Sequence, residues 1–532
     1  MPLKERIKKV PGIYFVLVIL TVNALYWCMA KEGYYIDELW SYGLSNGYNT
    51  PLFYQTEEYM DNWHQPDFYE EYLTVQPEER FAYASVYDNQ VHDVHPPLYY
   101  ILLHTVCSLF PGRFSKWFGL LVNLPFYCGA VLLLYKISGQ VLGKKSRSRV
   151  IPPLLYGLSV GAVATLIYIR MYMLLTFWAL LLVFLVFRLI REQTGKKRLP
   201  LLVMISLTIT AGFLTQYYFA IFAFFLSAVY IIRGIFLRRW REAAGYATAA
   251  CAGIMCGILV FPASLQHIFR GQQGQRAFDN AANGFRLFFE HWSAYQGTVM
   301  SEFFGNERIG QIFLLVVLLG LMPVYIYSAK KKKQKIIAWN IVLRSEWFLL
   351  FAAVIGYFSV IIQISPEVID RYQFMIYPFG VLLITAAVVY LLGVSGKEWF
   401  VWMITGGCLL LILWAYAIRP VPYTYEGYQE VLDRLGTEYR DAPGIYVTAG
   451  DHLLINNCLF FTRQERTYPL TLEQAGELPV ICEGMETEYL VLYVDIYYDE
   501  WQTAERVAEL LGYRSFALLY DNTFTQIFLL AR

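Results

Sequence analysis

The chain has 532 residues, of which 57% are hydrophobic and only 16% are charged, and its mean hydropathy is +0.40. Soluble domains carry about a quarter charged residues, so this composition excludes an ordinary soluble protein. The formal net charge is +1, and no basic patch indicates a nucleic-acid partner.

Long apolar runs recur from Ile13 to Tyr416. They predict an all-α polytopic membrane domain over residues 1–418 with roughly 11–13 transmembrane helices, because a span needs about 20 apolar residues and must be helical. The run 95–110 is short, so it is either a span or a partial, re-entrant helix. No A-x-A cleavage site follows the first run, which predicts an uncleaved span. The predicted spans are 12–30, 95–110, 117–141, 150–168, 171–190, 199–215, 217–237, 243–266, 308–328, 346–364, 371–393 and 398–417.

Clusters of Lys and Arg predict the orientation of these spans, since such clusters favour the cytoplasmic side. They lie at 4–9, 144–149, 196–198, 238–241 and 330–335. A cytoplasmic N-terminus then places the segments 31–94, 267–307, 365–370 and 419–532 outside the plasma membrane. Two runs between residues 94 and 144 give one crossing too many, so either 95–110 does not cross fully or one cluster breaks the rule.

The predicted first outer loop, 31–94, contains thirteen Asp and Glu residues against two basic ones, and it is rich in aromatic residues. Two stretches, "DELWSYGLS" and "PEERFAYASVY", are typical of amphipathic helices that lie along a membrane surface. The first contains Asp37 and Glu38 close to the end of a span. These carboxylates are either interfacial and helix-capping residues, or a general base or cation ligand at the membrane face.

The stretch "VHDVHPPLYY" ends this loop and contains His92, Asp93 and His95. Its prolines fit the first turn of a helix, where amide donors are not needed. Imidazole and carboxylate groups are ligands for divalent cations, so the cluster is a candidate metal site or a phosphate-positioning site. The alternative is a helix cap with interfacial histidines.

Two arginines lie at predicted outer turns, against the positive-inside bias. Arg170 stands beside Tyr172 in "IYIRMYM", and Arg371 precedes Tyr372 in "DRYQF". Another outer turn, "TQYYF", carries Tyr217. Each arginine is either a snorkelling residue or a phosphate ligand, because guanidinium offers a bidentate fork to phosphate oxygens.

Residues 419–532 lack long apolar runs and predict a small extracytoplasmic α/β domain. "YTYEGYQEVLDRLGTEY" and "DEWQTAERVAELLG" are amphipathic, and "GIYVTAG", "EYLVLYVDI", "SFALLY" and "TQIFLLAR" are typical of strands. Cys458 and Cys482 lie in this region and could pair outside the cell.

Taken together, carboxylates, histidines and arginines gather on one predicted face of the membrane. This pattern favours a cavity for an anionic lipid head group with a carboxylate beside it. In a lipid-phosphate-linked donor the phosphate is the leaving group, which arginines stabilise, while a carboxylate accepts a proton from the attacking hydroxyl or amine.

Five elements in this order also resemble a known family: "IDELWSYGLS", "HPPLYY", "RMYMLLTFW", "TQYYF" and "RYQFMIYP". The chain resembles the GT-C membrane glycosyltransferases over residues 10–395, in the branch of the protein O-mannosyltransferases (glycosyltransferase family 39) and the aminoarabinose transferases. The resemblance implies a polyprenyl-phosphate-linked sugar donor in the outer leaflet and inversion at the anomeric carbon.

For individual residues, the resemblance implies that Asp37 is the general base and Glu38 its paired neighbour. His95 would lie near the active site, and Arg170 and Arg371 near the donor phosphate. The O-mannosyltransferases continue "HPP" with Gly-Lys, whereas Leu98 and Tyr99 follow here, which weakens a mannose-to-protein interpretation.

A second catalytic carboxylate has no clear match, which leaves Asp93 as the substitute candidate. No cofactor is required by the arrangement, and a divalent cation at His92, Asp93 and His95 stays open. The expected partners are a polyprenyl-phosphate-linked sugar, membrane lipid and an extracytoplasmic acceptor, which is a protein, a lipid or a cell-envelope glycan. The rival hypotheses are a flippase for lipid-linked glycans and a non-catalytic envelope assembly protein.

Overall fold

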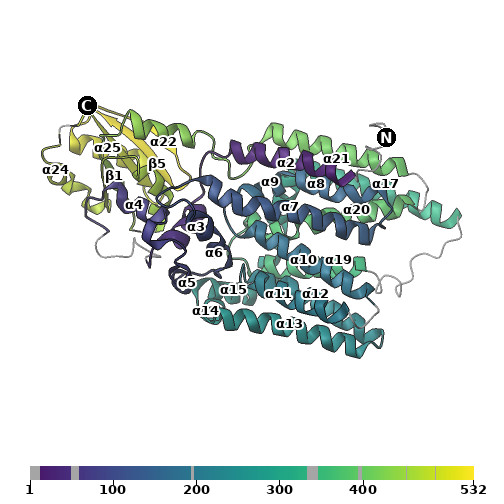
Figure 1. Cartoon of the computed structure of the whole chain (residues 1–532). Helices are drawn as coiled ribbons and strands as arrows, with labels where there is room; N and C mark the ends of the chain where they lie inside the picture. Colours follow the sequence, from purple (N-terminus) through teal and green to yellow (C-terminus); the bar gives the residue numbers. More distant parts are fainter. Residues whose placement is uncertain are drawn as a thin grey trace, which may run out of the picture. The chain divides into compact units, whose positions relative to one another are not determined.

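The computed structural model describes residues 12–49, 59–192, 197–331, 346–393, 398–450, 452–485 and 487–532. The chain forms two compact units (Figure 1). The first unit contains residues 1–28, 94–99 and 120–422, and the second contains residues 29–93, 100–119 and 423–532. The second unit thus combines most of the predicted first outer loop with the C-terminal region, and the predicted boundary at residue 418 stays a prediction.

Each predicted span contains a helix, which confirms the helical, multi-pass character of the chain. Eight described helices are long and apolar enough to cross a membrane, and a ninth span results if α8 and α9, bent by 57°, are counted as one. The helices of the predicted spans are α2 (Gly12–Ala30), α6 (Leu98–Cys107), α7 (Lys116–Val141), α8 (Ile151–Leu158), α9 (Val160–Ile167), α10 (Tyr172–Arg191), α11 (Arg198–Phe213), α12 (Tyr218–Phe236), α13 (Trp240–Val260), α17 (Glu307–Lys331), α19 (Glu346–Ile364), α20 (Tyr377–Gly393) and α21 (Glu398–Ile418).

The length of helix α6 bears on how many times the chain crosses the membrane between residues 94 and 144. Its 10 residues extend for about 15 Å, half of the roughly 30 Å hydrocarbon core, so it is too short to cross. A single crossing by α7 between the predicted outer loop and the basic cluster 144–149 agrees with the predicted orientation, which stays a prediction. The basic clusters 4–9 and 332–335 lie outside the described residues.

The helices of the first unit pack closely because small residues face their neighbours. Helices α10, α11, α12 and α13 lie side by side (Figure 1), and α11 and α13 form an extensive contact. At Gly253 of α13 an added Cβ would lie 2.7 Å from the backbone oxygen of Ser206 in α11. A larger residue would therefore force these two helices apart.

Three further helices connect α13 to α17 in the segment that the sequence predicts to be a second outer loop. They are α14 (Ala263–Phe269), α15 (Gln272–Ala282) and α16 (Phe285–Phe304). Helix α16 packs on α17, α19 and α21. The predicted loop is therefore largely helical and rests on the membrane domain.

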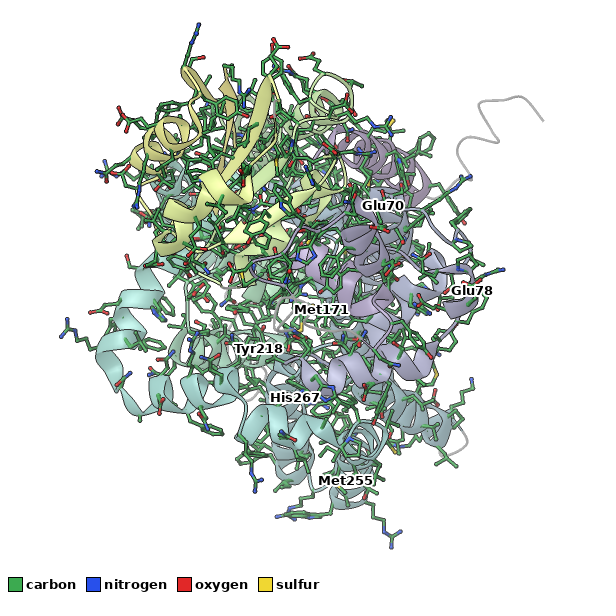
Figure 2. All side chains as sticks on the ribbon, turned by 90° about the vertical axis from the view of Figure 1, so that its left-hand side faces the viewer. Glu70, Glu78, Met171, Tyr218, Met255 and His267 are labelled. Carbon is green, nitrogen blue, oxygen red and sulfur yellow. The ribbon has the colours of Figure 1, made fainter. Side chains whose placement is uncertain are left out.

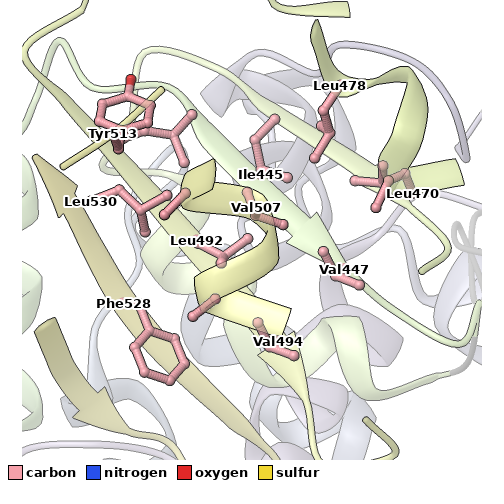
Figure 3. Packing of buried hydrophobic residues seen from close by; sticks show 14 of the residues in the cluster. Ile445, Val447, Leu470, Leu478, Leu492, Val494, Val507, Tyr513, Phe528 and Leu530 are labelled. Carbon is pink, nitrogen blue, oxygen red and sulfur yellow. The ribbon is translucent and has the colours of Figure 1, made fainter. Parts of the chain in front are cut away.

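The C-terminal region forms a five-stranded sheet in the order β2-β1-β3-β5-β4. Strands β1 (Gly444–Val447), β2 (Thr467–Leu470) and β3 (Tyr489–Asp495) are parallel, and β5 (Thr525–Ala531) pairs antiparallel with both β3 and β4 (Ser515–Asp521). Leu492 and Phe528 of the sheet pack with Val507 of α25 (Glu500–Leu511) in its core (Figure 3). The predicted α/β character is confirmed, and Gly512, with φ 73°, ends α25 as expected.

Strand β2 is the one strand among the described residues that the sequence did not predict. Its Pro469 cannot donate to a ladder, and proline is tolerated in edge strands, which is where β2 lies. Cys458 and Cys482 are both free thiols.

The predicted first outer loop contains three described α-helices of its own and precedes α6. They are α3 (Ile36–Asn46), α4 (Pro66–Leu73) and α5 (Tyr83–His92). Helix α3 begins one residue before the predicted stretch "DELWSYGLS" and contains all of it. The second stretch, "PEERFAYASVY", forms a short 3-10 turn at Pro77–Glu79 and the start of α5.

Asp495, at the carboxyl end of β3, generates a pH prediction. Burial raises the pKa of this carboxyl to about 6 from 3.8, although Thr448, Tyr446, Ala449 and Thr525 donate hydrogen bonds to it. Between these values the folded state binds more protons than the unfolded state, so stability falls as pH rises, by at most about 3 kcal/mol. We expect the opening free energy of β3, measured by amide exchange corrected for intrinsic rates, to fall between about pH 4 and about pH 7.

The matched variant Asp495→Asn removes the titrating group and should flatten this pH dependence. Stability that rises with pH in the wild type would mean that the hydrogen bonds outweigh the burial of Asp495.

Candidate functional site

The turn that carries Arg170 is fixed by a buried asparagine. Asn123 of α7 is fully buried, and its Nδ2 donates to the carbonyl oxygens of Leu166 and Tyr168, at 2.9 Å each. The amide of Arg170 donates to the carbonyl of Tyr168 at 2.8 Å. These bonds satisfy the backbone where α9 has ended and α10 has not begun, so the position of Arg170 is well defined.

The side chains of Arg170 and His95 lie against each other. The sequence predicts both residues on the same face of the membrane. Arg170 is only 3% exposed, and its Nη2 lies 3.4 Å from Nε2 of His95. The segment of His95 is held by a hydrogen bond from the amide of Leu98 to the carbonyl of Leu214, at 3.0 Å. A neutral His95 can accept a hydrogen bond from the guanidinium and so orient it.

Arg371 reaches the same turn from another part of the chain. It lies in a 3-10 turn at Asp370–Tyr372, where Oδ1 of Asp370 accepts its amide hydrogen at 2.7 Å. Its Nη1 donates to the hydroxyl of Tyr168 at 3.1 Å. Arg371 therefore reaches the short turn to which Arg170 belongs. The amide of Arg170 bonds to the carbonyl of Tyr168, and the guanidinium of Arg371 bonds to the hydroxyl of Tyr168.

Several tyrosine rings contact one another around Arg371 and the turn of Tyr168. Tyr172 stacks on Tyr168 with a centroid distance of 5.8 Å, and Tyr218 meets Tyr372 edge-on at 5.4 Å. The Arg371 guanidinium lies 5.9 Å from the ring centroid of Tyr372. Figure 2 labels Met171 and Tyr218, which mark this cluster among the side chains. Aromatic faces of this kind attract cations and exclude water.

Tyr217 and the residue after it contact different parts of the chain. Its hydroxyl lies 2.9 Å from Nδ1 of His267 in α14, a residue that Figure 2 also labels. Tyr218, the next residue of the same predicted outer turn, contacts Tyr372. Two adjacent tyrosines are indistinguishable by sequence pattern, so their different neighbours are seen only in the structure.

Glu302 of α16 is a buried carboxyl that the sequence analysis missed. It is 1% exposed, and burial and the neighbouring Asp370 raise its pKa well above the ordinary value. Burial and the nearby Asp370 therefore both disfavour the charged form of the Glu302 carboxyl. Gly161 makes room for it, since an added Cβ there would lie 2.7 Å from Oε2 of Glu302.

An apolar cavity of about 340 Å³ lies next to this group in the first unit. Helices α8, α16, α19, α20 and α21 contribute to its wall, which includes Trp292, Met300, Phe303, Tyr377 and Thr385. Such a cavity suits a hydrocarbon chain rather than a polar ligand.

In the second unit, the two acidic residues of α3 have different surroundings. Glu38 is fully buried, its Oε2 lies 3.0 Å from Nζ of the equally buried Lys31, and the amide of Tyr35 donates to it at 2.7 Å. Asp37 is only half-buried. Successive helical residues point about 100° apart, so the carboxyl groups leave α3 in different directions, and Glu38 is committed to Lys31.

The end of α5 carries the other predicted polar residues. Nδ1 of His92 lies 2.9 Å from the carbonyl oxygen of Asp88, one turn earlier, and its side chain is 59% exposed. Asp93 follows as the residue that ends α5. His92 thus contacts its own helix, whereas His95 contacts Arg170.

The described residues of either unit contain no group of three His, Cys, Asp or Glu side chains placed to hold a metal ion together. His95 lies against a guanidinium, and a divalent cation at His92, Asp93 and His95 stays a prediction.

Comparisons with known proteins add the following. No protein-family model and no curated protein matches the chain. Among solved structures, ArnT from Cupriavidus metallidurans bound to undecaprenyl phosphate is similar, with 10% identity, a TM-score of 0.49 and 98% of both chains covered. The oligosaccharyltransferase AglB from Archaeoglobus fulgidus, with an inhibitory peptide and a dolichol-phosphate, has 11% identity and a TM-score of 0.46, covering 94% of this chain and 71% of its own.

A further structure of the Archaeoglobus fulgidus oligosaccharyltransferase, a complex with Zn and sulfate, is similar at 11% identity and a TM-score of 0.45. At these scores and identities the likeness establishes neither a family nor an activity. The function proposed below therefore rests on the residues of this chain.

The buried pair of Lys31 and Glu38 generates a stability prediction. Lys31→Met leaves a buried carboxylate without its cation and should destabilise α3 by about 3–5 kcal/mol, whereas Lys31→Met combined with Glu38→Met should cost much less. The exposed pair of Arg434 and Glu438 is the control, and Arg434→Met should change stability by less than about 1 kcal/mol. Amide exchange of α3 and α22 (Tyr428–Thr437) measures each effect locally.

If the double variant is as unstable as Lys31→Met alone, the loss comes from other contacts of Lys31 and not from the buried, uncompensated charge of Glu38.

Proposed function

We propose that this protein is an integral-membrane glycosyltransferase of the GT-C type, which transfers a sugar from a polyprenyl-phosphate-linked donor to an extracytoplasmic acceptor. The observation that carries the proposal is the meeting of Arg170 and Arg371 at the turn of Tyr168. The guanidinium of Arg371 lies at this turn, and that of Arg170, which belongs to the turn, lies against His95; in this proposal both bind the oxygens of one lipid phosphate. The order of the five sequence motifs supports the same class.

In this proposal the donor phosphate binds Arg170 and Arg371 and leaves with its electron pair when the bond between the anomeric carbon and the phosphate oxygen breaks. Positive charge fixed before the reaction stabilises the negative charge that develops on the leaving oxygen. His95 orients Arg170, and the rings of Tyr172 and Tyr372 limit access of water. The apolar cavity beside α16 accommodates part of the polyprenyl chain.

Asp37 is the proposed general base. Its carboxylate accepts the proton of the acceptor hydroxyl or amine while the acceptor atom bonds to the anomeric carbon. Glu38 is proposed to support α3 rather than to react, because Lys31 neutralises it in a buried pair. Asp93 stays the candidate for a second carboxylate, Tyr217 for a contact with the substrate, and a cytoplasmic N-terminus is proposed from the basic clusters.

The first test of this function replaces the proposed base. Asp37→Asn keeps the size of the side chain but removes its basicity, so the turnover number should fall by about 10²–10⁴-fold, with little change in KM for the donor. The measurement is sugar transfer by the purified protein from a panel of polyprenyl-phosphate sugars to envelope acceptors.

Asp88→Asn is the matched control, because Asp88 is an exposed acidic residue of the same unit. Full turnover by Asp37→Asn would refute the assignment of the base. A flippase would instead move lipid-linked glycan across vesicles without transfer, and a non-catalytic assembly protein would show neither activity.

The second test addresses the phosphate receptor. Arg371→Lys keeps the positive charge but loses the planar fork and the bond to Tyr168, so kcat/KM for the donor should fall by about 10²–10³-fold. Arg170→Lys should act in the same direction. Arg286→Lys is the control, since Arg286 is 90% exposed and pairs with Glu290.

Binding of polyprenyl phosphate without sugar, measured by calorimetry in detergent, should weaken in parallel. Unchanged binding in both lysine variants would place the phosphate elsewhere.

A further inference from the structure

The C-terminal region makes a continuous set of contacts with the acidic helix α3 inside the second unit. The contacts begin just after α2. The amides of Glu32 and Gly33 donate to the carbonyl of Thr424 at 2.7 and 3.2 Å, and the amide of Gly427 donates to Oε2 of Glu32 at 2.7 Å. An added Cβ at Gly33 would lie 2.5 Å from the ring of Tyr428, so only glycine permits this approach.

The segment after Tyr423 adopts a conformation that suits these bonds. Tyr423 and Tyr425 have φ values of 69° and 55°, in the left-handed region that non-glycine residues rarely occupy. Nζ of Lys31 donates to the carbonyl of Tyr423 at 2.8 Å as well as contacting Glu38. One buried ammonium group therefore joins the first turn of α3 to the start of the C-terminal region.

A second contact lies along α3 itself. The 3-10 helix η7 (His452–Asn457) packs on α3, and the ring of Phe524 lies 5.6 Å from that of Tyr35. Hydrogen bonds of asparagine side chains hold η7 in place. Asn522 Nδ2 donates to the carbonyl of Asn456 and to Oδ1 of Asn457, both at 3.0 Å, and Asn457 Nδ2 donates to Oγ1 of Thr525 at 3.0 Å.

A third contact joins the far part of the loop to the edge of the sheet. His64 forms an antiparallel bridge with Thr467 of β2, with amide-to-carbonyl distances of 2.8 and 2.9 Å. The hydroxyl of Tyr69 in α4 lies 2.7 Å from Oγ1 of Thr467. The loop thus covers an edge strand that would otherwise expose unpaired backbone groups.

From these three contacts we propose that the C-terminal α/β region is a fixed frame that positions Asp37, with Glu32 and Lys31 as positioning residues that act through α3. This inference rests on the proposed role of Asp37 as the base. A frame of this kind stays attached during turnover, in contrast to a separate module that binds the acceptor and moves. A small displacement of a catalytic group can cost about 10²-fold in rate, which explains why the loop that carries α3 is tied to the C-terminal region at three places.

The test compares Glu32→Ala with Glu32→Gln. The alanine variant loses the acceptor for the amide of Gly427, while the glutamine variant keeps an acceptor oxygen of the same reach. We expect Glu32→Ala to lower kcat by about tenfold with an unchanged KM for the donor, and Glu32→Gln to restore kcat. Equal kcat in both variants and the wild type would overturn the role of Glu32.

A cysteine pair tests whether the frame stays attached. The Cα atoms of a hydrogen-bonded antiparallel pair are about 5.5 Å apart, which permits a disulfide between His64→Cys and Thr467→Cys. The oxidised variant should keep the turnover of its own reduced form, with oxidised wild type as the control for the eight native cysteines. Loss of turnover on oxidation and recovery on reduction would show that the domain must detach, which contradicts the frame.

Amide exchange separates failure of this inference from failure of the proposed function. Exchange in α3 should be faster in Glu32→Ala than in Glu32→Gln whether or not sugar transfer is observed. If the wild type transfers no sugar, the proposed function fails while this difference still tests the frame. If α3 exchanges equally in both variants, the frame fails even when the enzyme is active.

Discussion

The second unit is organised around one buried ion pair. Lys31 and Glu38 are both inaccessible to solvent, with 3.0 Å between ammonium and carboxylate, and neither charge is tolerable there without the other. Their pairing requires the end of α2, the first turn of α3 and the carbonyl of Tyr423 to meet at one point. The constraint therefore links the segment before α3, the acidic helix and the C-terminal region within the second unit.

The positions of charged side chains in the first unit also depend on polar partners. Charged side chains near the ends of apolar helices are costly unless other polar groups meet them. Arg170 is met by His95 and Arg371 by Tyr168, while the buried amide of Asn123 satisfies the turn between them. The protein thus keeps two cations at a break between helices, where backbone and hydroxyl groups supply the hydrogen bonds that lipid cannot.

The sequence predicted the helices and most strands because both follow from hydrophobic periodicity, which is local. It selected Arg170 and Arg371 because their charge contradicts the neighbouring composition. It missed Tyr168, Asn123 and Glu302, whose roles depend on residues far away in the chain. It also missed β2, because Pro469 is untypical of a strand. The hydrogen bond from Lys31 to the carbonyl of Tyr423 was missed too, since the two residues are 392 positions apart. Contacts of this range leave no pattern in a single sequence.

The Asp-Glu pair shows why proximity in sequence does not imply a shared role. Two adjacent carboxylates in water would be equivalent candidates for a base. On a helix they point about 100° apart, so one can enter a buried ion pair while the other stays half-exposed. The contact with Lys31 holds the carboxyl of Glu38 at one place in the interior, and this fixes the rotation of α3 about its own axis. The direction of Asp37 is then a consequence of the ion pair, so the group that reacts is positioned by the neighbour that does not.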